Sequence, residues 1–493
     1  MFPPNLAKRG AYLGTIRPLP SLTQLSQSNN MKFSISITAS HDGGNIKFIS
    51  QSEPMISDKK SAAITVTLRI KPDVYTELEK TSHMQYWSFR SFISGSEALI
   101  TGAAVESIIV KYVIANAKDA SFPTAWPGTT ICYTTGSLES CDDDLWKRNL
   151  TTDYIDGALT WEHVHTTNGS TFFSYYPPYT YTRHIKLISD CSALINTRGS
   201  ECSKYDPVIE SLGQTLDGRE MECLSIGNGK LIAWIQHRQH PGETQTEFFA
   251  EGFLDRLFGI DKERKVDDAI EKVLEQYRLY IIPNMCPDGS VRGHIRTNAA
   301  GANLNREWCT IPGNNYEAPT MECSPEVVAV LSKMDQTGCD FFLDVHSDEE
   351  LPYCFFSGAK MTPVWCDRIE HLYGYFVEHY RQHNPDVQKE IGYPPPASVE
   401  LAMKYMNKAT TQVSNRFNCL GLTLELPYKD CATNPDPERG FSIARCKKMG
   451  SDLVDALLDV HPYLRADGDF WSTFSIDDRY VVPRATVDWK SYQ

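Results

Sequence analysis

A histidine and a glutamate lie three residues apart in the segment HPGE at 240–243, where an apolar, strand-like run at 231–236 gives way to an amphipathic pattern. Imidazole nitrogen and carboxylate oxygen both bind zinc, and this spacing lets the side chains of His240 and Glu243 converge on one ion. The chain contains 13 histidines, however, so one such pair is expected by chance. The segment alone predicts half of a metal site, with a metal-free role as the alternative.

A second pair with the same spacing begins at His346, in the segment HSDE at 346–349. His346 ends the apolar run 341–345, and an acid-rich loop follows. Because sites form where the strands of α/β sheets end, two strand-terminal segments that meet at one edge would bring His240, Glu243 and His346 together. Two nitrogens, one carboxylate and an open fourth position make a catalytic rather than a structural zinc set. For each histidine taken alone, an ordinary surface side chain is the alternative.

Glu425 is a candidate for moving a proton. In the run LTLEL at 422–426 the three leucines share one face of a strand, so Glu425 points to the other face beside Thr423. A carboxylate at this strand end that faces a zinc site can accept a proton from an attacking water and later deliver it to a leaving amine. A carboxylate that is merely solvated is the alternative.

Arginines and asparagines gather in the polar, turn-rich stretch 284–306. It contains Arg292, Arg296, Asn305 and Arg306. A planar guanidinium beside an asparagine can hold a carboxylate through two hydrogen bonds, whereas a single arginine in such a loop is more often a solvated surface residue. The stretch is therefore a candidate subsite for a carboxylate.

Strand patterns precede these groups in the chain. Apolar residues alternate with polar ones at 33–37 and 64–70, and the runs 108–114 and 171–176 are also strand-like. Residues 31–182 are therefore expected to form an amino-terminal, all-β antiparallel sandwich domain.

After about residue 185 the pattern changes to short apolar runs that alternate with helical segments, as in an α/β domain. We expect a mixed, twisted sheet flanked by helices, with strands at 231–236, 279–284, 341–345 and 420–425. Helices are predicted at 244–258, from 324 onward, and near 363–383 and 441–458. Residues 183–465 form the predicted catalytic domain, and 466–493 are expected to be an irregular tail.

The overall composition narrows the possible partners and the compartment. The formal net charge is −14 and no basic tract is present, so nucleic-acid binding is not expected. No run of about eighteen apolar residues could cross a bilayer. The 14 cysteines are dispersed without a CxxC pair, which favours reduced thiols in a cytoplasmic enzyme. Residues 1–30 lack the apolar core of a secretory signal and are expected to be a flexible extension, with a mitochondrial presequence as the alternative.

Five motifs occur in one order along the chain: HPGE at 240–243, NMCPDG at 284–289, GANLNREW at 301–308, DVHSDEE at 344–350 and TLELPYKD at 423–430. Together they resemble the zinc carboxypeptidases of the carboxypeptidase A family, in particular its cytosolic carboxypeptidase branch. The segment FFSYYPPYTY at 172–181 resembles the end of the amino-terminal β-sandwich of that branch. The resemblance covers about residues 31–465.

The resemblance implies a site with one Zn²⁺ ion. His240, Glu243 and His346 match the zinc ligands of the family, and Glu425 matches the carboxylate that activates water. Glu349 is then left as a charge of the loop.

The resemblance also assigns the arginines. Arg296 best matches the arginine that polarises the scissile carbonyl and stabilises its oxyanion, with Arg292 as a nearby rival. Asn305 and Arg306 match the pair that holds the terminal carboxylate of the substrate, as an exopeptidase requires.

Two positions depart from the family pattern or stay open. Asn303 stands where many relatives have an aspartate near a zinc-bound histidine, and because an amide adds less basicity to the imidazole, weaker zinc binding is expected. The mobile active-site tyrosine of the family matches either Tyr393 or Tyr405.

The predicted function is a zinc-dependent metallocarboxypeptidase that removes carboxy-terminal residues from peptides or protein tails. Members of this branch often remove glutamates, and Lys404, Lys408 and Arg416 lie where residues of the side-chain pocket are expected. The alternatives are a zinc amidohydrolase that acts on a small acylated amino acid, and a non-catalytic binding protein with the same fold.

Overall fold

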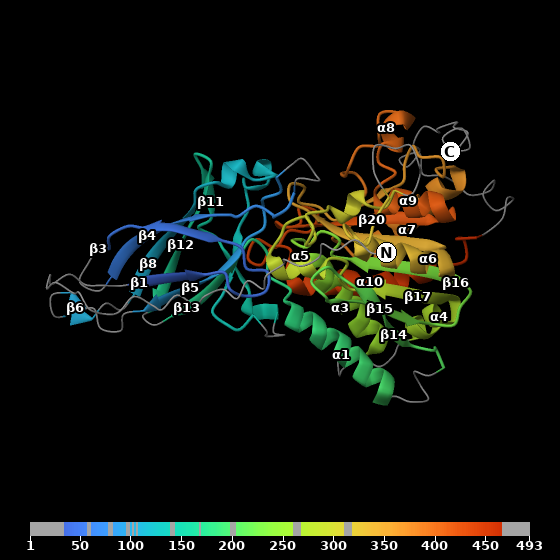
Figure 1. Ribbon diagram of the computed structural model, residues 1–493, viewed down its shortest axis with the longest axis horizontal. Coiled ribbons are helices and arrows are strands. Elements are labelled where there is room, and N and C mark those ends of the chain that lie inside the picture. The colour runs from blue at the N-terminus through green and yellow to red at the C-terminus, as the bar shows by residue number, and fades with distance from the viewer. Residues whose placement is uncertain are drawn as a thin grey trace, which may run out of the picture.

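The computed structural model describes residues 34–56, 61–76, 82–94, 99–100, 103–104, 107–138, 143–166, 169–197, 204–259, 268–309 and 318–465. The predictions for residues 1–30 and 466–493 lie outside these ranges. Figure 1 shows a narrow part built of strands beside a broader part in which helices surround a central sheet. We call the described residues up to 176 the β lobe and those from 181 onward the α/β lobe.

Two main sheets form the β lobe. One has the order β1 (Ser34–Thr38), β5 (Ser88–Ser94), β13 (Ser170–Ser174), β9 (Ile131–Thr134) and β10 (Lys147–Asn149). The other has the order β11 (Asp153–Ile155), β12 (Ala158–Thr166), β8 (Ser107–Ile114), β4 (Ser61–Arg69) and β2 (Lys47–Gln51), and β3 (Met55–Ile56) pairs with β4. The short strands β6 (Leu99–Ile100) and β7 (Ala103–Ala104) pair with each other. The described pairs are antiparallel, as predicted, except that β4 and β8 run parallel.

An aromatic core lies between these sheets. Every second residue of β4 from Ala62 to Leu68 is buried, which is the period of two that the sequence predicts for a half-buried strand. Trp161 stacks on Trp87 at 5.3 Å and on Tyr112 at 5.2 Å between ring centroids. Rings of this size bury large apolar areas, so they account for much of the stability of the lobe.

The α/β lobe is built on a seven-stranded mixed sheet, as predicted. Its order is β14 (Val208–Gln214), β15 (Glu220–Ile226), β17 (Tyr277–Ile282), β16 (Leu231–His237), β18 (Phe341–Asp348), β20 (Leu420–Pro427) and β19 (Phe355–Gly358). The four central strands, β17, β16, β18 and β20, run parallel. The outer strands pair antiparallel. The four strands expected from the sequence are the four parallel ones.

Helices cover both faces of this sheet: α1 (Tyr181–Thr197), α3 (Gln245–Phe258), α4 (Asp268–Gln276), α5 (Pro287–Arg292), α6 (Pro325–Thr337), α7 (Asp367–His383), α8 (Val399–Met403), α9 (Ala409–Phe417) and α10 (Ile443–Val460). Successive strand residues point to opposite faces. Phe341 of β18 therefore packs in the apolar cluster that contains residues of α3, α7 and α10, while Phe342 packs in the cluster that contains residues of α6 and α9. The central strands are buried on both sides, which explains their continuous apolar runs.

The two lobes share one apolar core. Tyr175, just after β13, stacks on Tyr428, just after β20, with ring centroids 4.5 Å apart. Tyr428 in turn donates a hydrogen bond from its hydroxyl to the backbone oxygen of Gly242, 2.7 Å away. The predicted domain boundary between residues 182 and 183 falls in the first turn of α1.

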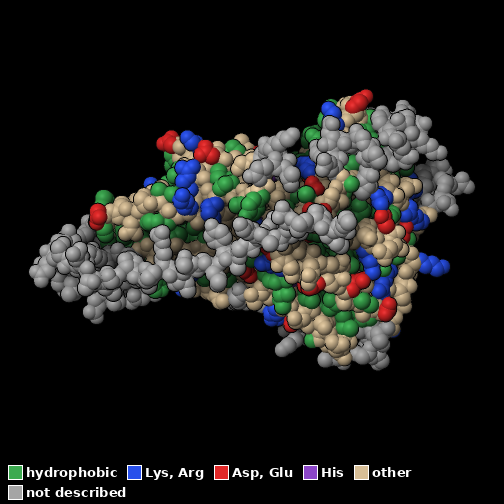
Figure 2. Space-filling model, viewed as in Figure 1, with side chains coloured by type: hydrophobic (Ala, Val, Ile, Leu, Met, Phe, Trp, Pro, Cys, Tyr) green, Lys and Arg blue, Asp and Glu red, His purple; other side chains and the backbone are tan. Residues whose placement is uncertain are grey.

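Two further observations bear on partners. None of the helices in the described part of the chain is long and apolar enough to cross a membrane. On the face that Figure 2 shows, basic and acidic side chains of the described residues are interspersed, and the basic ones form no continuous tract.

Candidate active site

The ends of β16, β18 and β20 bring the candidate groups to one edge of the sheet. These strands are adjacent and parallel, so their carboxyl ends meet at that edge. His237, the last residue of β16, pairs in register with Val345, and His346 pairs with Glu425. The HPGE segment follows β16 directly and turns into α3. Residues distant in sequence therefore face one another.

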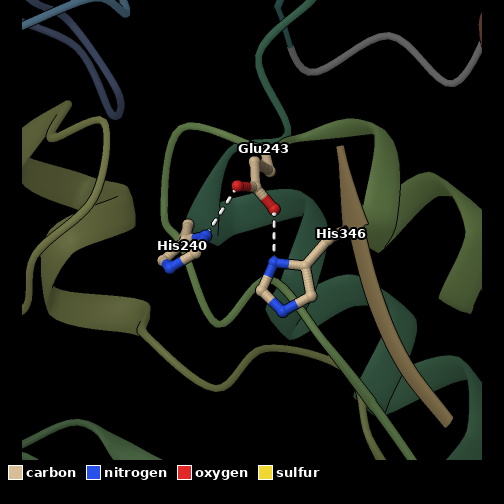
Figure 3. A group of neighbouring side chains, drawn as sticks. All are labelled: His240, Glu243 and His346. Atoms are coloured by element: carbon tan, nitrogen blue, oxygen red, sulfur yellow. Dashed lines mark hydrogen bonds and ion pairs between the residues drawn. The ribbon is translucent and has the colours of Figure 1, made fainter. Parts of the chain in front are cut away.

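His240, Glu243 and His346 form a buried cluster (Figure 3). Nδ1 of His240 lies 2.7 Å from one carboxylate oxygen of Glu243, and Nδ1 of His346 lies 2.9 Å from the other. The three side chains offer two nitrogens and one oxygen that all lie within 4.8 Å of one another. Both imidazoles thus point at the same carboxylate, and their ring centroids lie 4.7 Å apart.

The outer nitrogens of the two histidines are held by other side chains. Nε2 of His240 lies 3.1 Å from Oδ1 of Asn303, which also accepts a hydrogen bond from the backbone N–H of Asn305. Nε2 of His346 lies 2.9 Å from Oδ2 of Asp344. Such partners fix the ring orientation and leave Nδ1 of each ring for a metal ion. Asp344 was not among the residues predicted from the sequence.

The electrostatics of this cluster fit a cation. Burial, together with the charge of Arg296, lowers the pKa of His240 to about 3, so its ring is neutral at pH 7. In the tautomer that donates from Nε2 to Asn303, the neutral ring presents a lone pair at Nδ1 to the Glu243 carboxylate. In that tautomer two acceptors face each other at 2.7 Å, an arrangement that a cation between them stabilises. Nitrogen and carboxylate donors of this kind suit Zn²⁺.

The carboxylate of Glu243 stays ionised in this setting. Burial by itself raises its pKa, but His240 and His346 outweigh burial and hold the pKa well below the ordinary value. Burial lowers the pKa of His346, whereas the carboxylates of Asp344 and Glu243 raise it. The carboxylates have the larger effect, so the pKa lies well above its ordinary value.

Glu425 lies beside the cluster and is 6 % exposed. Burial raises its pKa well above the ordinary value, with Glu243 and Asp348 adding to the rise and His346 opposing it. The hydroxyl of Tyr393 lies 3.1 Å from Oε1 of Glu425 and 2.6 Å from Oδ2 of Asp348. A protonated Glu425 can donate to the Tyr393 oxygen while Tyr393 donates to Asp348, so the three groups can share and move protons.

The two tyrosines that the sequence left open lie in different surroundings. Tyr393 lines the cavity and contacts Glu425. Tyr405 instead lies beside Lys408, with the ammonium 4.5 Å from its ring centroid, and is not among the residues that line the cavity.

A cavity of about 290 Å³ opens over the cluster. One wall is basic and carries Arg296, Arg306 and Lys408, with Asn305 between them and the cluster. Nδ2 of Asn305 lies 3.5 Å from Nε2 of His346, and Nη1 of Arg306 donates to the backbone oxygen of Asn305 over 2.7 Å. Burial and the two arginines lower the pKa of Lys408 to about 8.

The cavity also has acidic lining residues, which come from the end of β18 and the residues after it. They are Asp348, Glu349 and Glu350. Glu349, expected to be a charge of the loop, is buried instead, and burial together with Glu243 raises its pKa well above the ordinary value. Phe122 of the β lobe also lines the cavity, and Thr124 of the short helix η2 (Pro123–Ala125) donates to Glu350. No pattern in the sequence indicated that the β lobe reaches this rim.

Three basic residues considered from the sequence lie elsewhere. Arg292 pairs with both carboxylate oxygens of Asp217, at 3.0 Å and 2.7 Å, and does not line the cavity. Arg416 pairs with Asp335. Lys404 follows α8 as an exposed residue outside the cavity lining.

Sequence comparisons cover both lobes. A model of the family described as "Cytosolic carboxypeptidase N-terminal domain" matches residues 37–176, and one described as "Zinc carboxypeptidase" matches residues 202–439. An uncharacterised protein of Zymomonas mobilis is 34% identical over 437 residues, which are 88% of this chain and 98% of that protein. Cytosolic carboxypeptidase 6 of Mus musculus is 26% identical over 196 residues, 38% of this chain and 33% of that protein.

Solved structures of similar proteins also match both lobes. A metallo-carboxypeptidase from Burkholderia cenocepacia is 31% identical, with 87% of this chain and 99% of that chain covered and a TM-score of 0.71. A metallo-carboxypeptidase from Pseudomonas aeruginosa, solved in complex with (2-guanidinoethylmercapto)succinic acid, is 30% identical, with 87% and 100% covered and a TM-score of 0.70.

Proposed function

Because the chain belongs to the zinc carboxypeptidase family, we propose that it removes carboxy-terminal residues, preferentially glutamates, from peptides or protein tails in the cytoplasm. Family membership makes the protein a zinc-dependent peptidase. The observation that carries the finer proposal is the cavity itself, in which a His-Glu-His cluster lies between Glu425 and a wall of three cations.

His240 and His346, each through Nδ1, and a carboxylate oxygen of Glu243 would hold the zinc ion. When bound, zinc lowers the pKa of water and polarises a carbonyl group. Asn303 and Asp344 keep the two rings in the orientation that this binding needs. Burial of the cluster keeps competing water away from the ligand atoms.

Glu425 acts as the proton carrier. Its carboxylate takes a proton from the attacking water, holds it at an oxygen of the side chain, and delivers it to the nitrogen of the leaving amine. The raised pKa of Glu425 supports this role, because it favours the carboxyl form that holds the proton until the nitrogen of the leaving amine accepts it. Tyr393 donates to Oε1 of Glu425 and lowers its pKa, which opposes burial and stabilises the ionised form that accepts the proton.

The basic wall binds the end of the substrate. Asn305 and Arg306 hold the terminal carboxylate, and Arg296 donates to the oxygen of the scissile carbonyl as negative charge develops there. Lys408 pairs with the side-chain carboxylate of a terminal glutamate. With Arg306 assigned to the terminal carboxylate and Arg296 to the scissile carbonyl, Lys408 is the cation of this wall that remains for an acidic terminal side chain, despite the net charge of −14.

The contribution of the β lobe favours a peptidase over an amidohydrolase for small acylated amino acids. Phe122 and Thr124 border the cavity. A peptide substrate would extend out of the cavity past these residues, whereas a small acylated amino acid would be too short to reach them. Family membership likewise argues against a non-catalytic binding protein.

The test is mass spectrometry of products from blocked peptides that differ only in the last residue, with and without a zinc chelator. Loss of a single glutamate from the Glu-ended peptide, abolished by the chelator and restored by zinc, is the expected result. Equal cleavage of Glu-, Leu- and Lys-ended peptides would contradict the glutamate preference, and cleavage of none of them would contradict the proposed reaction.

A further inference from the structure

A carboxylate of the β lobe binds the backbone of the segment that carries Arg296. Asp73, four residues after the end of β4, is 4 % exposed. Its Oδ1 accepts a hydrogen bond from the backbone N–H of Ile295 at 2.8 Å. Its Oδ2 accepts from the backbone N–H groups of Arg296 at 2.9 Å and Thr297 at 3.0 Å, and from the Thr297 hydroxyl at 3.0 Å. Four donors of one segment thus converge on one side chain of the other lobe.

The Arg296 side chain depends on this attachment. Its guanidinium lines the cavity, and within the part of the chain that the structure describes no side chain forms a hydrogen bond or ion pair with it. The hydrogen bond of Arg296 to Asp73 holds its backbone, which sets the point from which the guanidinium reaches into the cavity. Three consecutive N–H groups bound to one carboxylate fix that backbone, because hydrogen bonds to a charged acceptor are stronger than neutral ones.

Both ends of the same segment also press against the β lobe. Nδ2 of Asn45 donates to the backbone oxygen of Gly293 at 3.0 Å. Gly301 has φ +81°, and a Cβ atom at this position would lie 1.9 Å from the backbone oxygen of Tyr75. The stretch that holds Asp73 and Tyr75 and the stretch from Gly293 to Gly301 therefore fit together with no room for movement.

We infer that Asp73 is a positioning residue for the peptidase reaction: the β lobe, through this carboxylate, holds Arg296 where it meets the scissile carbonyl. The inference rests on the proposed role of Arg296. Asp73 makes no direct contact with the His-Glu-His cluster or Asn305 among the described residues, and it reaches the HPGE segment through Ile295, whose backbone oxygen accepts from the N–H of Gly242 at 3.1 Å. Because that bond does not use the carboxylate, loss of the carboxylate should leave zinc binding and terminal-carboxylate binding in place. What is lost is the alignment of one donor with the charge that develops in the transition state, which lowers kcat rather than raising KM.

The experiment is a double-mutant cycle on the full chain, with a blocked peptide ending in Glu-Glu and the same peptide ending in Leu as substrates. Asp73→Asn keeps the shape of the side chain but replaces one acceptor oxygen with a donor. We expect kcat to fall about tenfold or more with KM changed less than about twofold, since small misplacement of a catalytic group is costly. In the Arg296→Ala background the same substitution should change kcat less than about twofold, because residues that act through one another are not additive.

Asn45→Ala is the comparison variant for loss of fold support, because it removes buried hydrogen bonds from the same lobe to the backbone of Gly293, Lys71 and Tyr86 without touching residues 295–297. Zinc content and thermal unfolding are measured for every variant. If Asp73→Asn does not fold, Thr297→Val removes one bond to the same carboxylate and enters the same cycle.

Each outcome separates the two proposals. Equal losses of kcat from Asp73→Asn in both backgrounds, or an equal loss from Asn45→Ala, would mean that Asp73 supports the fold and would overturn the inference. A normal kcat for Asp73→Asn beside a low kcat for Arg296→Ala would overturn it as well and leave the role of Arg296 intact. A normal kcat for Arg296→Ala would contradict the proposed function at that residue, and the inference with it.

Discussion

His346 and Glu425 are register partners on the adjacent parallel strands β18 and β20, so their side chains leave the sheet on the same face at the same edge. The pairing places the proposed proton carrier next to a proposed zinc ligand, and both residues belong to strands rather than to loops. Both groups are buried, and the charge of His346 acts directly on the pKa of Glu425. These two groups of the proposed chemistry thus lie on buried central strands of the sheet.

Replacement of Glu425 by glutamine should abolish proton transfer and spare the metal. The amide keeps the shape of the side chain but cannot accept the proton of water, so kcat should fall by about 10³-fold, within the range for a lost general base. Zinc content, measured by mass spectrometry of the purified variant, should remain at one ion per chain. Normal turnover by the glutamine variant would remove Glu425 from the mechanism.

The outer partners of the two histidines should tune zinc affinity in opposite directions. Asp344→Asn takes a carboxylate away from Nε2 of His346, and zinc affinity should drop by about 10- to 100-fold. Asn303→Asp adds a carboxylate at Nε2 of His240, and affinity should rise. Competition with a chelator of known affinity measures both. A shift of the same sign in the two variants would show that these contacts do not act through the basicity of the rings.

The fold and the centre of the site were predictable for one physical reason. Apolar runs with buried neighbours on both sides predicted the parallel strands, and parallel strands end at a common edge, which is where His346 and Glu425 lie. The mixed sheet and the preceding all-β part are confirmed. The parallel pairing of β4 with β8 was not foreseen, because an alternating strand looks the same whichever way its neighbour runs.

Contacts between the lobes could not be predicted from local patterns. Asp73 and Phe122 belong to loops of the β lobe, and nothing in their own sequence surroundings indicates that they reach the other lobe. Arg292 and Arg296 were hard to separate for the same reason. Both lie in one polar stretch, and the ion pair between Arg292 and Asp217 becomes visible only in the folded structure.

Replacement of Arg292 and of Arg296 by alanine should therefore have very different effects on kcat. Arg292 and Asp217 form a partly exposed ion pair, worth about 0 to 1 kcal/mol, so Arg292→Ala should leave kcat unchanged and lower stability slightly. Arg296→Ala should lower kcat by about 10²- to 10³-fold, as expected for a lost oxyanion donor. Steady-state kinetics and thermal unfolding of the two variants side by side provide the test, and a larger kinetic loss at Arg292 would reverse the assignment.

Lys408 should make the preference for glutamate depend on pH. Burial and two arginines lower its pKa to about 8, so its ammonium is charged below that pH and loses its charge as the pH rises through it. A cation bound in the cavity would repel the ammonium and lower the pKa of Lys408 further. The value of kcat/KM, which reports the free enzyme, should therefore fall at or below about pH 8 for a Glu-ended peptide and stay flat in that range for a Leu-ended one. Lys408→Met should remove the step and most of the difference between the two peptides, with kcat on the Leu-ended peptide kept. A pH profile shared by both peptides and unchanged in Lys408→Met would show that this lysine does not read the terminal side chain.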